Sequence, residues 1–211
     1  MSQPYNVVDV RQRTEAWLRW REEGVAASEA AVIMNQDPHK TYWRLWAEKV
    51  GLAIPEDLSK NPFVQWGIAN EDLARQDFEA RHPGEFAIPM CVESVKYPWM
   101  KASLDGLISG NRPVELKCPA DSTFDEVCRN GTSSPTYKLY WHQVQHQLAV
   151  TGANEGFLVF WKLGQEPQIF RIERDDAFIF DLIKECEKFA ESVLKRKSPP
   201  KDPERDVFIP T

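Results

Sequence analysis

Three residues near the middle of the chain have the types and spacing that metal-assisted cleavage of a phosphodiester requires. Asp105 is followed ten residues later by Glu115, and Lys117 lies two positions further on. They fall in two short apolar stretches, 104–108 and 114–118, which a Ser-Gly-Asn-Arg-Pro break separates; this pattern predicts two strands joined by a turn. Because alternate side chains of a strand share a face, Glu115 and Lys117 are expected to point to the same place.

If the two strands pair, Asp105 brings a second carboxylate to that place. Two carboxylates make a hard oxygen site suited to Mg²⁺ or Mn²⁺. Such a metal would polarise a phosphoryl oxygen and lower the pKa of a bound water, while Lys117 could orient the water and offset developing charge. The alternative is an ordinary hairpin with an exposed ion pair, since Asp-Gly turns and Glu-x-Lys strands are common.

A third carboxylate stands on an expected helix. Asn61 followed by Pro62 predicts a helix start, and the helix should run to about Arg81. Glu71 lies within its largely apolar stripe, where a carboxylate is costly unless something compensates it. The alternative is a glutamate at the helix edge, paired with Arg75 one turn later.

A second expected helix, 137–151, ends at Gly152 and carries polar residues beside its inner stripe, including Gln143 and Gln147. His142 and His146 resemble half of a zinc-binding motif, but Gln143 stands where the motif needs a general-base glutamate. Solvated or stacked histidines are the alternative interpretation.

The order of the expected helices and strands predicts an α/β (α+β) fold, in which helices flank a central mixed sheet. One domain, 1–197, accounts for them, and the Pro-rich segment 198–211 is expected to be a poorly ordered tail. Helices are expected at 11–23, 28–34, 41–50, 61–81, 137–151 and 175–196, and strands at 86–92, 96–103, 104–108, 114–118, 156–161 and 168–174.

Composition narrows the class of protein. With 42% hydrophobic and 27% charged residues among 211, the chain has an ordinary globular composition. It has no apolar run of about 20 residues and no signal-peptide pattern, so we expect a cytoplasmic protein without a membrane span. A net charge of −6 argues against wholesale coating of nucleic acid, although a local basic channel could begin near the N-terminus, at Arg11, Arg13, Arg19 and Arg21.

The four cysteines are scattered, with no Cys-x-x-Cys pair, so neither a zinc ribbon nor a disulfide scaffold is favoured. An iron–sulfur cluster is the alternative to weigh. Cys186 lies on an apolar helical stripe and Cys118 faces the expected core, which favours buried thiols instead.

Four blocks in order resemble the lambda exonuclease family of phage recombination nucleases, within the PD-(D/E)xK nuclease superfamily. They cover residues 20–30, 66–71, 103–106 with 115–119, and 140–145. Two positions differ from the family pattern. Leu104 replaces a proline before the aspartate, and Thr123 stands where a basic residue is expected.

The resemblance implies a role for each matching residue. Asp105, Glu115, Glu71 and the carbonyl of Leu116 would hold Mg²⁺, with Mn²⁺ able to substitute and two ions expected. Lys117 would position the attacking water, and Gln143 would support the site. The pair Arg21 and Ser28 would bind the 5′-phosphate of a DNA end; Ser28 is expected to begin a helix whose free N–H groups attract an anion.

The resemblance also implies an activity and partners. The chain would degrade one strand of linear duplex DNA from its 5′ end, releasing mononucleotides and leaving a 3′ overhang for strand-annealing recombination. A homotrimeric ring, a single-strand annealing recombinase as partner and a phage or prophage origin follow from the same resemblance. Phe63 and Val64 are candidates for an element that separates the end base pairs.

Two alternatives remain at this point. One is a restriction- or repair-like endonuclease with the same chemistry. The other is a non-catalytic adaptor that binds DNA ends, which the joint retention of Asp105, Glu115 and Lys117 disfavours.

Overall fold

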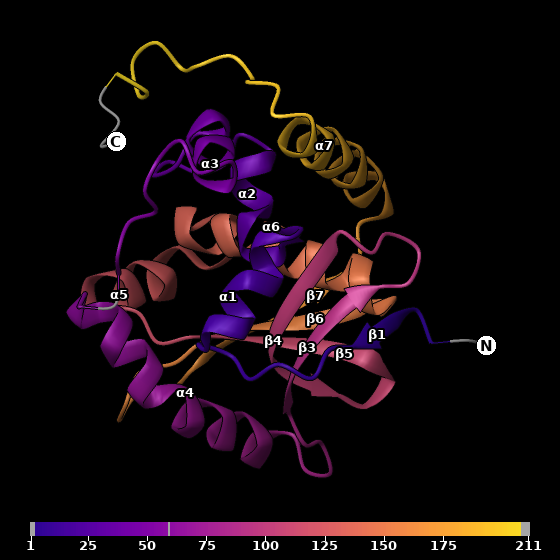
Figure 1. Ribbon diagram of the computed structural model, residues 1–211. Helices are drawn as coiled ribbons and strands as arrows, with labels where there is room; N and C mark the ends of the chain where they lie inside the picture. Colours follow the sequence, from indigo (N-terminus) through magenta and orange to yellow (C-terminus); the bar gives the residue numbers. More distant parts are fainter. Residues whose placement is uncertain (1–2, 59, 208–211) are drawn as a thin grey trace.

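The computed structural model describes residues 3–58 and 60–207, and its centre is one mixed β-sheet (Figure 1). The sheet has seven strands in the order β1-β3-β4-β5-β6-β7, and β2 pairs with β4 off this path. Two pairs are parallel, β2 with β4 and β5 with β6, and the others are antiparallel. The strands are β1 (Tyr5–Val7), β2 (Val25–Ala26), β3 (Ile88–Ser94), β4 (Met100–Ile108), β5 (Arg112–Lys117), β6 (Glu155–Phe160) and β7 (Gln168–Glu173).

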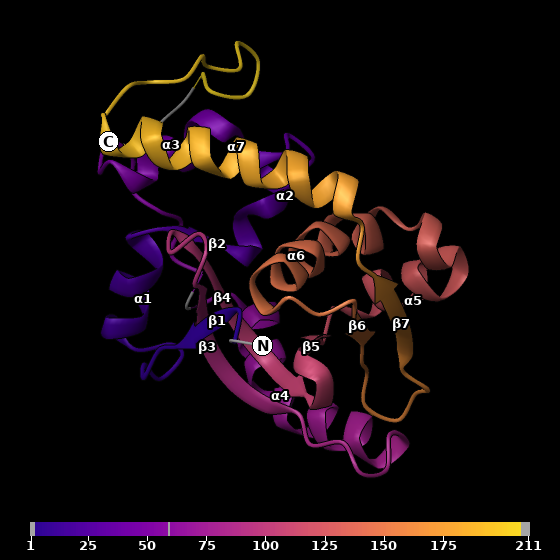
Figure 2. The ribbon, with the colours of Figure 1, turned by 90° about the vertical axis from the view of Figure 1, so that its right-hand side faces the viewer.

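Helices cover both faces of this sheet, as predicted (Figure 2). The helix α6 packs on one face and α4 on the other, while α7 lies over α2 and α3 as an outer layer. The bounds are α1 (Glu15–Glu22), α2 (Ala30–Ile33), α3 (Tyr42–Lys49), α4 (Pro62–Arg81), α5 (Asp121–Asn130), α6 (Pro135–Thr151) and α7 (Asp176–Leu194), with 3₁₀ turns η1 (Ala27–Glu29), η2 (Ser109–Asn111) and η3 (Gly131–Ser133). Within 3–58 and 60–207, no helix is both long and apolar enough to cross a membrane.

The strand β5 shows the predicted alternation of side chains. Val114 and Leu116 pack against α4, in a core that contains Phe78. Glu115 and Lys117 point to the opposite face, which α6 covers. Glu115 is therefore buried rather than exposed, with only 2% of its surface accessible.

Capping side chains set the helix boundaries near the predicted positions. The hydroxyl of Thr41 accepts the Arg44 N–H at 2.9 Å and begins α3. The side chain of Asn61 accepts the Phe63 N–H at 2.9 Å, and Pro62 takes the first position of α4. At the start of α6, Ser134 accepts the Tyr137 N–H at 3.1 Å. These starts confirm the helices that the sequence predicts.

The strand expected at 86–92 is present as β3, which begins at Ile88 and has an irregular register around Pro89. Two other expectations about local structure were wrong. The strands expected at 96–103 and 104–108 are one strand, β4, which begins only after Pro98 because proline cannot donate to a ladder. Ser28 does not begin a helix: it lies inside η1, whose N-cap is Ala26, and the Glu29 carboxylate accepts the Ala26 N–H at 2.9 Å.

The C-terminal segment, for which the sequence predicts little order, makes defined contacts over residues 198–207. Trp43 of α3 donates from Nε1 to the Ser198 hydroxyl at 3.0 Å, and Lys201 lies over the Trp43 ring at 4.4 Å. The Thr41 hydroxyl donates to the buried Asp206 carboxylate at 2.6 Å. Residues 208–211 of the expected tail lie outside the described residues.

Candidate active site

The end of the β4–β5 ladder places Asp105. The antiparallel pairing covers Gly106 to Ile108 on β4 and stops there. Just beyond it, the Asp105 carboxylate accepts the Leu116 N–H at 2.9 Å. Gly106 is required next to it, because a Cβ at that position would lie 2.6 Å from the Cβ of Ala87. Asp105 is thereby fixed beside β5.

The neighbouring carboxylate, Glu115, is held by α6. Gln143 and Gln147 lie one helical turn apart and donate from their Nε2 atoms to the two carboxylate oxygens, at 2.7 and 2.6 Å. The ammonium of Lys117 reaches Glu115 Oε1 at 2.6 Å and lies 4.3 Å from the centre of the Tyr140 ring. Each oxygen of Glu115 therefore has a fixed donor, which sets the direction of the carboxylate.

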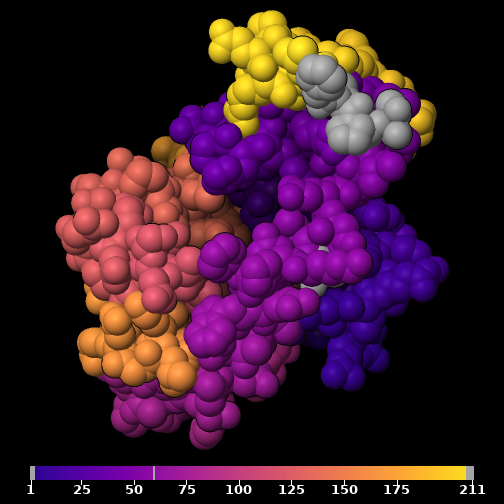
Figure 3. Space-filling model, turned by 90° about the vertical axis from the view of Figure 1, so that its left-hand side faces the viewer, coloured from indigo at the N-terminus to yellow at the C-terminus, as the bar shows by residue number. Residues whose placement is uncertain are grey.

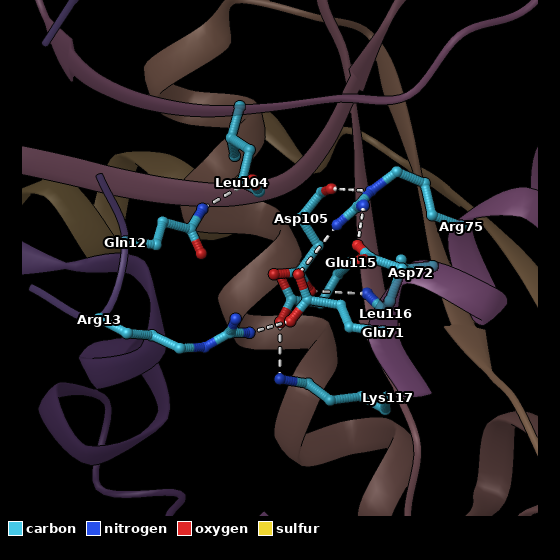
Figure 4. A network of polar contacts seen from close by, with 10 residues as sticks. All are labelled: Gln12, Arg13, Glu71, Asp72, Arg75, Leu104, Asp105, Glu115, Leu116 and Lys117. Carbon is cyan, nitrogen blue, oxygen red and sulfur yellow. Dashed lines mark hydrogen bonds and ion pairs between the residues drawn. The ribbon is translucent and has the colours of Figure 1, made fainter. Parts of the chain in front are cut away.

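The third carboxylate, Glu71, enters from α4. Its Oε1 accepts from Arg75 at 2.9 Å, and its Oε2 pairs with Arg13, from the turn before α1. The Arg75 Nε also donates to the Asp105 carbonyl at 3.0 Å, which ties α4 to β4. Figure 4 shows the carboxylates of Glu71, Asp105 and Glu115 gathered at one point, with the cationic side chains directed at them.

Burial and like charge perturb this cluster. Burial, reinforced by the negative charges of Glu115 and Glu71, raises the pKa of Asp105 well above its usual value, while Lys117 partly offsets the effect. For Lys117, burial alone would lower the pKa, but the adjacent acidic groups, Glu115 first, raise it above its usual value. Asp105 still keeps some accessible surface, so solvent reaches it. At neutral pH, Lys117 is an ammonium that can donate but cannot act as a base.

The two residues for which the sequence predicts phosphate binding, Arg21 and Ser28, come together from α1 and η1. The guanidinium of Arg21 donates to the Ser28 hydroxyl at 2.7 Å and lies 4.4 Å from the Trp17 ring centre. Trp17 in turn donates to the Ser103 hydroxyl at 2.6 Å, two residues before Asp105. Arg21 is thus linked through one side chain to the strand that carries Asp105.

The space-filling view shows a hollow on one face of the molecule. In Figure 3 it lies between α5 on one side and the stretch from α3 to α4 on the other. Indigo atoms, from the N-terminal part of the chain, lie at its floor.

Comparison with known proteins identifies the family. Residues 16–154 match the YqaJ-like viral recombinase domain. The chain belongs to this family. The match contains Arg21 and Ser28 as well as Glu71, Asp105, Glu115, Lys117 and Gln143.

Two curated relatives are similar over part of their length. The uncharacterized protein YqaJ of Bacillus subtilis (strain 168) is 28% identical over 192 residues, which cover 89% of this chain and 59% of that protein. The uncharacterized protein R354 of Acanthamoeba polyphaga mimivirus is 26% identical over 156 residues, covering 68% of this chain and 28% of that one. The chain thus spans about three fifths of the first relative and less of the second.

Solved structures of exonucleases share the fold. The alkaline exonuclease LHK-Exo from Laribacter hongkongensis matches with a TM-score of 0.73 and 28% identity, over 87% of this chain and 97% of that one. Its complex with dAMP gives a TM-score of 0.74 and 26% identity, over 87% and 94%. A phage-related exonuclease from Haemophilus somnus, at 13% identity, a TM-score of 0.60 and coverage of 83% and 96%, shares the fold alone. This YqaJ-like chain is therefore homologous to alkaline exonucleases and has the PD-(D/E)xK nuclease fold, which confirms the resemblance to the lambda exonuclease family.

The structure brings together the site residues that the sequence predicts. Asp105, Glu115, Glu71, Lys117, Gln143 and the backbone of Leu116 meet at one point, and Arg21 meets Ser28. Sequence reasoning did not assign Gln147 to the site, although its spacing of four residues from Gln143 signalled a shared helix face. It also missed Arg13 as a partner of Glu71, because nothing in a loop sequence marks that contact.

The donor set fits a divalent cation. Three carboxylates are crowded into one partly buried place. Burial first, and then the charges of Glu115 and Glu71, raise the pKa of Asp105, and a bound cation would favour its ionised form. Within residues 3–58 and 60–207, no group of three or more His, Cys, Asp or Glu side chains is already arranged to hold a metal ion. In the described conformation, arginine and lysine side chains pair with Glu71 and Glu115.

Thiols and histidines near the site have no comparable arrangement. Burial first, and then the charges of Glu71 and Asp105, raise the pKa of Cys118 to about 12, so this thiol stays protonated and is not a nucleophile. His142 packs against Trp141 and Phe178, as the stacking alternative predicts. His146 is not solvated: it is fully buried, and neither ring nitrogen makes a well-formed hydrogen bond, although the Lys101 backbone is close.

This buried histidine makes stability depend on pH. Burial lowers the pKa of His146 from 6.5 to about 3. Between these values the unfolded chain binds a proton that the folded protein does not, so stability should fall as pH falls, by up to about 1.4 kcal/mol per pH unit. Asp105, with a raised pKa, acts in the opposite direction. We therefore expect His146→Leu to lose the His146 contribution and to be less sensitive to acid than the wild type, measured by urea unfolding from pH 7 to 4. Parallel curves for the two proteins would contradict this assignment.

Proposed function

We propose that this chain is a Mg²⁺-dependent exonuclease that degrades one strand of linear duplex DNA from its 5′ end. The observation that carries the proposal is the meeting of Asp105, Glu115 and Glu71 with Lys117 at one point, in a chain homologous to alkaline exonucleases. Mononucleotide release and a 3′ overhang for strand annealing follow from the resemblance to the lambda exonuclease family.

The residues have separate tasks in this proposal. The carboxylates of Asp105, Glu115 and Glu71 and the Leu116 carbonyl would hold Mg²⁺, or Mn²⁺ in its place. Bound there, the cation would supply positive charge that polarises the scissile phosphate and makes the attacking water more acidic. Lys117 donates a hydrogen bond that orients this water and offsets charge on the phosphate.

The α6 amides serve as positioning groups. Gln143 and Gln147 hold both oxygens of Glu115, so the carboxylate keeps its direction when Lys117 turns toward the water. Preorganised groups of this kind avoid the cost of reorganisation during the reaction.

The DNA end is held by other elements of the chain. Arg21 would bind the terminal 5′-phosphate bidentately and the Ser28 hydroxyl would donate to it. Phe63, at the start of α4 and 63% exposed, supports the proposal that this helix end separates the terminal base pairs. A homotrimeric ring, two Mg²⁺ ions per site and an annealing partner belong to the same proposal and rest on the family resemblance.

Linear and circular substrates test this function. With Mg²⁺, we expect degradation of linear duplex carrying 5′-phosphates, slower degradation of 5′-hydroxyl ends, and no cutting of covalently closed circles. Arg21→Ala should reduce the preference for 5′-phosphate by about tenfold, the effect of losing roughly 1.4 kcal/mol of charge-assisted hydrogen bonding. Arg171→Ala is the matched control, because Arg171 is an exposed arginine of β7 that pairs with Glu155. Rapid cutting of closed circles would favour the endonuclease alternative.

A further inference from the structure

Arg13 occupies an unusual backbone position at the edge of the active site. Its φ is +67°, in the left-handed region that favours glycine, and it lies in the turn immediately before the N-cap of α1. The next residue, Thr14, closes this turn with a hydrogen bond from its hydroxyl to the Arg11 carbonyl at 2.7 Å. The preceding Gln12 donates to the Leu104 carbonyl at 3.0 Å, which holds the turn beside Asp105. The backbone of Arg13 is thus strained, and this conformation places its side chain beside Glu71.

Arg13 is the most exposed of the three cations around the carboxylates. Its side chain is 43% exposed, compared with 14% for Arg75 and 23% for Lys117. Arg75 is also bound to the Asp105 carbonyl and to Asp72, and Lys117 lies against the Tyr140 ring. Arg13 contacts Glu71 Oε2 and lies on the opposite side of the carboxylates from Arg75 (Figure 4). It is the cation that can leave with the least rearrangement.

The charges of Arg13 and of a divalent cation compete for the same carboxylate. Glu71 is paired with two arginines, and it is one of the groups proposed to bind Mg²⁺. A cation at Glu71 would repel the Arg13 guanidinium. A DNA strand entering the site would bring phosphate oxygens, which a guanidinium binds bidentately.

We propose that Arg13 is a movable counter-charge, which neutralises Glu71 in the cation-free protein and transfers to a phosphate of the DNA strand when a divalent cation takes its place. This inference rests on the proposed function. Every charge stays paired in this exchange. Glu71 pairs with the divalent cation in place of Arg13, and Arg13 pairs with a phosphate of the DNA. Arg75 stays in place and keeps α4 tied to β4.

Metal binding without DNA tests the first half of the exchange. We expect Arg13→Gly and Arg13→Asn to bind Mn²⁺ about three- to tenfold more tightly than the wild type by titration calorimetry, because an exposed ion pair no longer competes. Both residues tolerate a positive φ, so neither substitution should unfold the turn. Unchanged or weaker Mn²⁺ binding in both variants would overturn the proposal.

DNA binding tests the second half. In Ca²⁺, a 5′-phosphorylated duplex should bind the two Arg13 variants about fivefold or more weakly, and the slope of log K against log salt should fall by about 0.9, one phosphate contact. Arg13→Lys should restore part of the binding. Arg171→Ala, the control on the strand β7, should change neither Mn²⁺ nor DNA affinity; Arg171 is 62% exposed and pairs with Glu155. A role in folding alone would not produce opposite changes in the two affinities.

The outcomes separate this inference from the function on which it rests. Mn²⁺ binding and DNA degradation by the wild type, with both affinities unchanged in the Arg13 variants, would overturn the inference alone. A wild type that fails to bind Mn²⁺ would overturn the proposed function and the inference together.

Discussion

Replacement of Lys117 by alanine is expected to reduce DNA degradation by at least about 10³-fold, the scale of losing both water orientation and charge stabilisation. Lys117 is an ammonium at neutral pH, because the adjacent carboxylates raise its pKa despite burial. No other lysine or arginine is shown donating to Glu115 in the described part of the chain. Single-turnover digestion of a 5′-phosphorylated duplex would measure the loss.

Duplex binding should survive this change. Arg21 and Ser28, the proposed phosphate-binding pair, contact each other independently of Lys117, and Gln143 and Gln147 still hold Glu115. Affinity in Ca²⁺ should therefore stay within about threefold of the wild type, a change below roughly 0.7 kcal/mol. The matched control is Lys162→Ala: Lys162 is a similarly covered lysine, two residues beyond β6, that pairs with Asp121 at 3.1 Å. Activity retained by Lys117→Ala, or lost equally by Lys162→Ala, would contradict the assignment.

The second large effect is expected at Asp105, where activity and stability should change in opposite directions. Asp105→Asn should lose cleavage by at least about 10³-fold and weaken Mn²⁺ binding, because a neutral amide is a poor ligand for a hard cation. Its amide oxygen can still accept the Leu116 N–H, so the local fold should remain.

In EDTA, the same variant should be more stable than the wild type. The pKa of Asp105 is raised in the folded state, so its stabilising contribution is present below the unfolded pKa and is lost as pH rises through the folded value. At pH 8, removing this buried charge should raise the unfolding free energy by roughly 1 kcal/mol or more. Thermal melts at pH 5 and pH 8 would show the gain growing with pH. Asp77→Asn is the control with the opposite sign, since Asp77 is paired with Arg81 and accepts from Trp161 at 3.0 Å. If Asp105→Asn were less stable than the wild type, the prediction would be wrong, because the protein would then stabilise the Asp105 charge fully without a cation.

Periodicity made the catalytic strands and their helices predictable. The alternation along β5 placed Glu115 and Lys117 on one face, and the caps at Thr41 and Asn61 marked the starts of α3 and α4. The burial of Glu115 beneath α6 could not be predicted from periodicity. The helix α6 begins eighteen residues after the end of β5, and its packing on Glu115 is a tertiary contact. The sequence therefore predicted the groups of the site but underestimated the burial of Glu115.

Short or irregular elements escaped prediction. The strands β1 and β2 have three and two residues, too few for a period of two to show. Ser28 has the residue type of a cap, but Glu29 makes the capping contact because it reaches back to Ala26. Arg13 depends on a left-handed turn, which a sequence marks only when glycine or asparagine occupies it.

The pairing of β2 with β4 carries a mechanical consequence. Ala26, two residues before Ser28, is hydrogen-bonded into the same strand that carries Asp105, through its pairing with Lys101. An extended strand cannot lengthen. If the chain acts as proposed, the distance between the bound end of the nucleic acid and the bond to be broken would therefore be constant, and the released fragments would have one size whatever the base sequence.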